Sequence, residues 1–184
     1  MDELAITVIG RDRPGIIADV AEILAGLGMN LTDSTMTLLR GHFAMTLICT
    51  GPGGKGADGT GPGTPAIEDV KAALQPLTLD GSLVTTVSPV NPEAVPEPTG
   101  GHYVLSVHGA DRLGIVSSVT RGLAEFGGNV TDLTTRLSGD LYVLVAEVDL
   151  PAGTDVDLVR ERLDAVTRAL GVEVTLRPAE MDVL

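Results

Sequence analysis

Residues 10–33 read GRDRPGIIADVAEILAGLGMNLTD, and residues 109–132 read GADRLGIVSSVTRGLAEFGGNVTD. The two stretches align without a gap, and 12 of the 24 aligned residues are identical. Unrelated sequences of ordinary composition would share roughly one or two. Some identical residues are apolar and recur at helical spacing, but others are Gly, Asp, Arg, Asn and Thr, which a hydrophobic core does not require. The duplication therefore predicts two copies of one structural unit.

Each copy is predicted to begin with a strand and a helix. Residues 4–10 and 102–109 are short, rich in β-branched residues and end in glycine, which indicates strands. The apolar residues that follow recur at helical intervals in both copies, which predicts amphipathic helices. Asp12 is the expected N-cap of the first helix, accepting the N–H of Gly15, and Pro14 suits a first turn because it needs no N–H. Gly28 and Gly127 are expected to end the two helices.

The remainder of each copy predicts a hairpin, a second helix and a last strand. Turns are expected at residues 40–41 and 139–140, and Phe43, Met45, Leu47 and Cys49 alternate as in a half-buried strand. Helices are expected at residues 65–77 and 155–170, and closing strands at residues 82–89 and 172–178. The order βαββαβ, twice, predicts an α+β protein with two tandem ferredoxin-like domains. Each would have an antiparallel four-stranded sheet with helices on one face, and the strands after Asn30 and Asn129 would lie at sheet edges.

The predicted domain boundaries follow composition. Domain 1 spans residues 1–88, a Pro- and Gly-rich linker spans residues 89–101, domain 2 spans residues 102–178, and residues 179–184 form a tail. Residues 51–65, GPGGKGADGTGPGTP, are expected to be a flexible loop. They match the dinucleotide pattern G-x-G-x-x-G formally, but more Gly and Pro follow where that site requires a helix to begin.

Composition excludes several classes of function. The net charge of −13 opposes direct contact with nucleic acids and with anionic membrane surfaces, which attract clustered Lys and Arg. No signal peptide or apolar run of membrane-spanning length is found, and a lone Cys49 cannot form an intrachain disulfide, so we expect a cytoplasmic protein. The three histidines, at 42, 102 and 108, do not recur at equivalent positions and lack helical zinc spacing. We therefore predict no enzyme, no metal and no cofactor.

The repeated polar residues predict a ligand site. Backbone N–H groups at Gly15 and Ile16 would face an anion at a helix N-terminus, and glycine allows close approach. Asn30 and Asp33 offer an amide and a carboxylate, so together these groups suit the carboxylate and ammonium of a free amino acid. In the alternative interpretation, the same residues only cap the helix and form its turns. The predicted ligand-binding residues are Asp12, Pro14, Gly15, Ile16, Asn30, Asp33, Asp111, Leu113, Gly114, Ile115, Asn129 and Asp132.

DRPGI (residues 12–16), followed by GLGMNLTD (residues 26–33) within a βαββαβ unit, resembles the ACT domain, and the resemblance covers both halves. Two such units with no attached enzyme resemble the glycine cleavage system transcriptional repressor family, with Asp33-Ser34 and LLRGHF (residues 38–43) adding to the match. The second half departs from the motif at Leu113, which stands in place of proline.

The resemblance implies a regulator that binds an amino acid, often at domain interfaces, and acts through a protein partner, a transcription factor or a metabolic enzyme, without binding DNA itself. Two alternatives stay open: a detached regulatory subunit of an amino-acid-pathway enzyme, and an interaction module that needs no ligand. The oligomeric state stays open between two alternatives. The two sheets can pair edge to edge within one chain, or the chain can form a homodimer, for which the reasons are that ACT-like sheets often associate further and that the helices are unusually apolar.

Overall fold

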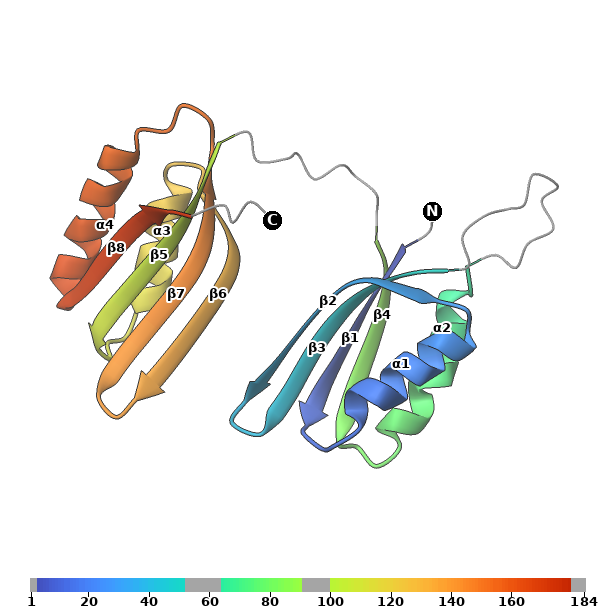
Figure 1. Cartoon of the computed structure of the whole chain (residues 1–184). Coiled ribbons are helices and arrows are strands. Elements are labelled where there is room, and N and C mark those ends of the chain that lie inside the picture. The colour runs from blue at the N-terminus through green and yellow to red at the C-terminus, as the bar shows by residue number, and fades with distance from the viewer. Residues whose placement is uncertain (1–2, 52–63, 91–99, 180–184) are drawn as a thin grey trace. The chain divides into compact units, whose positions relative to one another are not determined.

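The computed structural model describes residues 3–51, 64–90 and 100–179 of the chain. The chain divides into an amino-terminal unit, residues 1–94, and a carboxy-terminal unit, residues 95–184. In each unit a four-stranded sheet carries two helices on one face (Figure 1), which confirms the predicted fold class. The predicted glycine-rich loop, linker and tail lie largely outside the described residues.

The amino-terminal unit contains strands β1 to β4 in the sheet order β2-β3-β1-β4, with every neighbouring pair antiparallel. The long crossover from β1 to β2 carries the first helix, and β3 returns between those two strands. Its elements are β1 (Glu3–Arg11), α1 (Ile16–Gly26), β2 (Asn30–Leu39), β3 (His42–Thr50), α2 (Ile67–Leu74), the 3-10 helix η1 (Gln75–Thr78) and β4 (Leu83–Val90).

The carboxy-terminal unit repeats this topology with the sheet order β6-β7-β5-β8. Its second helix is longer than the equivalent α2. Its elements are β5 (Gly101–Ala110), α3 (Ile115–Ala124), β6 (Asn129–Ser138), β7 (Leu141–Leu150), α4 (Val156–Leu170) and β8 (Val172–Pro178). As predicted, β2 and β6 are edge strands of their sheets.

The start of α1 differs from the prediction, whereas its end agrees. The N-cap is Gly15, in the left-handed conformation with φ 92°, and no side chain caps the helix, so the expected cap by Asp12 is wrong. Pro14 lies in the turn before the helix, and the Asp12 N–H donates to the Gly41 carbonyl at 3.1 Å. At the other end, Gly28 has φ 73° and its N–H donates to the Ala25 carbonyl at 2.9 Å, as expected for a glycine that ends a helix.

Each unit has its own hydrophobic core between the sheet and the helices. The predicted alternation in β3 is confirmed, because Phe43, Met45, Leu47 and Cys49 are all buried. In the carboxy-terminal unit, Leu144, Ala146 and Val148 of β7 are buried at the equivalent positions of that unit's own core. None of the described helices is long and apolar enough to cross a membrane.

Candidate functional site

The duplicated loop between β1 and α1 is held by contacts on two sides. The Asp12 N–H donates a hydrogen bond to the Gly41 carbonyl in the turn of the β2–β3 hairpin. The Arg13 guanidinium forms a 2.8 Å ion pair with Asp19 in the first turn of α1 and donates to the Pro14 carbonyl at 3.3 Å. These contacts fix the path of the loop at the start of α1.

The backbone amides at the start of the two duplicated helices have no side-chain cap. In α1 the Asp19 N–H donates to the Gly15 carbonyl at 2.9 Å, and in α3 the Ser118 N–H donates equivalently to Gly114. The amides of the preceding helical residues find no side-chain acceptor. By contrast, Asp155 caps α4 by accepting the N–H groups of residues 157 and 158. The open N-termini of α1 and α3 can therefore donate to an anion.

A hollow of about 480 Å³ lies over the start of α1. Its polar part is formed by the loop residues Asp12, Arg13 and Gly15, and its apolar part by side chains of α1, β2 and β3. The lining residues are Asp12, Arg13, Gly15, Ile16, Ile17, Ala18, Ala21, Met36 and Phe43. A carboxylate acceptor beside helix amides suits a ligand that carries both an ammonium and a carboxylate.

A second hollow, of about 700 Å³, occupies the equivalent place in the carboxy-terminal unit. Leu113, in the position of Pro14, is fully exposed at its rim. The lining residues are Asp111, Arg112, Leu113, Gly114, Ile115, Val116, Ser117 and Tyr142. Because Tyr142 stands where the first unit has Phe43, and Ser117 where it has Ala18, this hollow is the more polar of the two.

The Tyr142 hydroxyl is expected to lose its proton at a higher pH than an ordinary tyrosine does. Burial raises its pKa and the Asp111 carboxylate adds to the increase, although a hydrogen bond with Thr135 opposes both. A folded-state pKa above the unfolded value of about 10 means that stability is fully present below that pH and is lost as pH rises through the folded pKa. We predict that the carboxy-terminal unit unfolds more easily above about pH 10 and that Tyr142→Phe reduces this loss.

Absorbance titration of the tyrosinate checks this prediction. In the wild-type protein one component should titrate above about pH 10, and Tyr142→Phe should remove it. If the substitution leaves the upper part of the titration curve unchanged, the assignment of the late component to Tyr142 is wrong.

Four of the predicted residues, Asn30, Asp33, Asn129 and Asp132, lie toward the end of each sheet that is far from the loop. In the strand register Asn30 is level with Thr50 and Glu3, whereas Asp12 follows Arg11 at the opposite end of β1. The eight-residue separation along β1 corresponds to roughly 25 Å. The structure thus brings together Asp12, Gly15 and Ile16, and likewise Asp111, Leu113, Gly114 and Ile115. Within a unit it does not bring Asn30, Asp33, Asn129 or Asp132 to the same hollow.

A β-bulge places Asn30 and Asp33 on one face of the sheet. Residues three apart in a regular strand point to opposite faces, but the register of β2 shifts between Leu31 and Asp33. The Thr32 hydroxyl at the bulge donates to the Ile48 carbonyl at 3.1 Å. β6 has the same shift between Val130 and Asp132, so Asn129 and Asp132 also share a face, the one opposite the helices.

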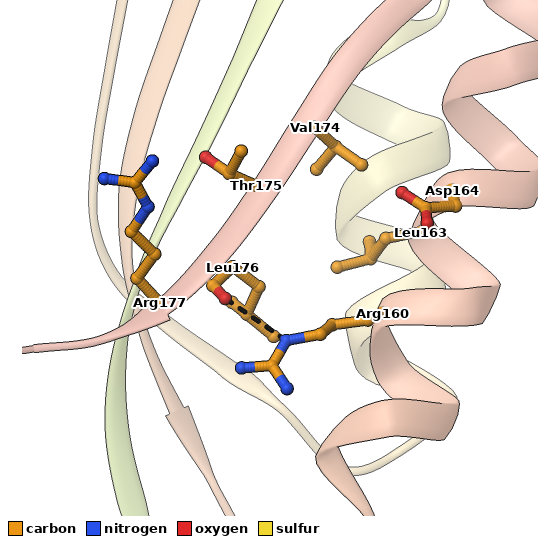
Figure 2. A pocket seen from close by; sticks show the side chains of 7 residues that line it. All are labelled: Arg160, Leu163, Asp164, Val174, Thr175, Leu176 and Arg177. Atoms are coloured by element: carbon orange, nitrogen blue, oxygen red, sulfur yellow. Dashed lines mark hydrogen bonds between the residues drawn. The ribbon is translucent and has the colours of Figure 1, made fainter.

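Another hollow, of about 280 Å³, lies between α4 and the edge strand β8 and contains none of the duplicated residues (Figure 2). Its floor is apolar, with Leu163, Val174 and Leu176. The Arg160 guanidinium donates to the Leu176 carbonyl at 3.3 Å. It also forms an ion pair with Asp157, so the positive charge of Arg160 already has a partner within the protein. Among the described residues no group of three His, Cys, Asp or Glu is placed to hold a metal ion.

The lining residues that the sequence prediction did not include comprise Arg13, Met36, Phe43 and Tyr142, among others. Arg13 recurs as Arg112 in the duplicated stretch, so a signal for it was present. The other three lie on strands that meet the loop only through sheet pairing and the β-hairpin, and no sequence pattern marked them as neighbours of the loop.

Comparison with known proteins identifies relatives of both units. The sequence model of the ACT domain matches residues 2–77 and 102–177. A UPF0237 protein of Methanopyrus kandleri is 39% identical over 75 residues, which cover 40% of this chain and 83% of that protein.

Two crystal structures match nearly the whole chain. An unknown protein from Galdieria sulphuraria has a TM-score of 0.74 and 24% identity, covering 97% of this chain and 98% of that one. Another, provisionally named a glycine cleavage system transcriptional repressor, has a TM-score of 0.69 and 23% identity, covering 97% of each chain. At these identities the likeness shows the fold.

Proposed function

The chain belongs to the ACT domain family, and from that membership we propose that it binds an amino acid at the β1–α1 and β5–α3 loops and passes this signal to a protein partner. The family indicates a regulatory protein that binds a small molecule rather than an enzyme. The observation that carries the site proposal is the uncapped N-terminus of α1 beside the Asp12 carboxylate, repeated at α3 beside Asp111.

In this proposal the amides at the start of each helix bind the ligand carboxylate, and Asp12 or Asp111 accepts hydrogen bonds from its ammonium. The apolar walls, Met36 and Ile17 in the first hollow, contact the ligand side chain. Because Tyr142 and Ser117 line the second hollow, the two sites are expected to differ in their preference for apolar and polar side chains.

A thermal-shift screen with the twenty amino acids tests binding, since a ligand that binds only the folded state raises the melting temperature. With the best ligand, the double variant Asp12→Asn and Asp111→Asn should weaken binding by about 10- to 100-fold, the loss of a hydrogen bond to a charged group. The matched control is Asp33→Asn with Asp132→Asn. It changes the charge equally, at the far end of each sheet, and should leave the affinity within about 2-fold.

Two other outcomes would contradict the proposed site or the proposed ligand. If the Asp33 and Asp132 variant, or Asn30→Ala with Asn129→Ala, loses binding while the loop variant keeps it, the site lies at the asparagine end and the loop proposal is wrong. If no amino acid binds, the chain is an interaction module that needs no ligand.

The partner is proposed to be a transcription factor, and the protein is proposed to act in the cytoplasm without touching DNA. The net charge of −13 supports the absence of direct DNA contact. The provisional name of the second crystal structure is the reason to test transcription first, and it describes that protein alone. Co-purification from the native cell, with and without the amino acid, separates this proposal from the second candidate, a regulatory subunit. An amino-acid-pathway enzyme in place of a transcription factor would favour that candidate.

A further inference from the structure

The two duplicated loops each contain an arginine, but only one of these arginines has an acidic partner. Arg13 and Arg112 align in the duplication, and each lines the hollow of its own unit. Arg13 forms its 2.8 Å ion pair with Asp19, whereas the residue that aligns with Asp19 is Ser118. Among residues 3–51, 64–90 and 100–179, no carboxylate forms an ion pair with Arg112. The second hollow is therefore lined by a guanidinium that is available to a ligand.

The ion pair of the first unit lies directly beside the start of its helix. A Cβ at Gly15 would be 3.9 Å from an atom of each partner in this pair. At the equivalent Gly114 the nearest atoms would be the hydroxyl oxygens of Ser117 and Ser118, at 3.7 Å and 3.9 Å. The carboxylate that neutralises the arginine in the first unit is thus replaced by an uncharged group in the second.

A further carboxylate acts on Arg13 from the turn before β4. Hydrogen bonds from Ser82 lower the pKa of the Asp80 carboxyl, and the positive charge of Arg13 adds to the decrease. In the carboxy-terminal unit the equivalent connection, from α4 to β8, is the single residue Gly171. The two acidic neighbours of Arg13 therefore both have uncharged counterparts near Arg112, and this difference lies in charge and not in topology.

We propose that the second hollow binds an amino acid with a carboxylate side chain, aspartate or glutamate, and that the first hollow binds an uncharged amino acid. The inference rests on the proposed function, in which the helix amides bind the α-carboxylate and Asp111 binds the ammonium. Arg112 then binds the side-chain carboxylate, because a guanidinium offers parallel N–H donors that match its two oxygens. In the first hollow a second carboxylate would have to displace Asp19 from Arg13.

The charges and sizes of the two hollows agree with this assignment. In the first hollow Asp19 offsets Arg13, so Asp12 leaves one negative charge, which suits the ammonium alone. In the second hollow Asp111 and Arg112 leave one charge of each sign, which suits an ammonium and an additional carboxylate. The second hollow is also the larger, at about 700 Å³ against about 480 Å³.

Isothermal titration calorimetry of the full chain tests the proposal with two matched pairs of ligands, aspartate against asparagine and glutamate against glutamine. The members of each pair have nearly the same size and differ in charge. The wild-type chain should bind aspartate or glutamate at least about 10-fold more tightly than the corresponding amide, the effect of a hydrogen-bonded charge pair. Arg112→Gln should abolish this preference. Arg121→Gln, which removes the same charge from the last turn of α3, should keep it.

Exchanging the residues at positions 19 and 118 tests the cause of the preference. Ser118→Asp gives Arg112 the ion pair of the first unit and should remove the preference while Arg112 is still present. Asp19→Ser releases Arg13 and should raise the number of aspartate or glutamate molecules bound per chain from one to two. Because a misfolded chain cannot gain a site, this last variant keeps the test decisive even if the others are unstable.

The outcomes separate this inference from the function on which it rests. If uncharged amino acids bind but aspartate and glutamate bind no more tightly than their amides, the inference is overturned and the proposed function stands. A preference that survives Arg112→Gln, or an unchanged stoichiometry in Asp19→Ser, also overturns it. If no amino acid of either kind binds, the proposed function fails and this inference fails with it.

Discussion

Replacing Gly10 with alanine is expected to destabilise the amino-terminal unit by about 3 kcal/mol. A Cβ at this position would lie 2.0 Å from the Ser82 carbonyl oxygen and 2.8 Å from the Leu83 Cα. These are backbone atoms, which cannot rotate aside as a side chain would. The substitution must therefore push β1 and β4 apart where the Arg11 N–H donates to Ser82 at 2.9 Å.

Two natural probes allow the effect to be assigned to one unit. Cys49, the only cysteine, is buried in the amino-terminal unit, and burial raises the pKa of its thiol, so it should react with thiol reagents only when that unit opens. Both tyrosines, Tyr103 and Tyr142, lie in the carboxy-terminal unit and report on its unfolding by fluorescence. Gly10→Ala should expose Cys49 at lower urea concentration and leave the tyrosine transition in place.

Gly26→Ala is the matched control. Gly26 is the last residue within α1, and a Cβ there would have no neighbour within 4 Å. The same substitution should therefore be neutral or stabilise the unit by about 0.5 kcal/mol. Unchanged Cys49 protection in Gly10→Ala would show that the close approach of β1 and β4 does not constrain this residue.

Leu163→Ala should destabilise the carboxy-terminal unit by about 3 kcal/mol. Leu163 is fully buried on α4, and its Cδ2 lies 3.5 Å from where a Cβ of Gly122 would stand on α3. Truncation loses the apolar transfer energy and leaves a cavity between the two helices. Here the tyrosine transition should move to lower urea, whereas the protection of Cys49 should not change.

Leu158→Ala on the same helix is the control, because Leu158 is 51% exposed, and its cost should stay below about 1 kcal/mol. Equal shifts in the two leucine variants would contradict the assignment of Leu163 to the core. If both probes move together in Leu163→Ala, the two units unfold as one cooperative system instead of separately.

The sequence by itself determined the order of the elements, the turns of both hairpins, the glycines that end α1 and α3, and the buried alternation of β3. These features depend on neighbours within a few residues, where apolar periodicity and the freedom of glycine act directly. The duplicated motif also located the loop residues that line the two hollows.

Only the tertiary structure decided which distant residues meet. The N-cap of α1 is Gly15 and not the predicted Asp12, because the left-handed glycine and the hydrogen bond to the hairpin turn set the path of the loop. The bulges turned Asn30 and Asp33 to one face, and strand register placed them far from the loop. The same register assembled four threonines, from positions 7 to 86, into one row. Pairing between strands far apart in the chain is a property of the whole sheet, and no local pattern specifies it.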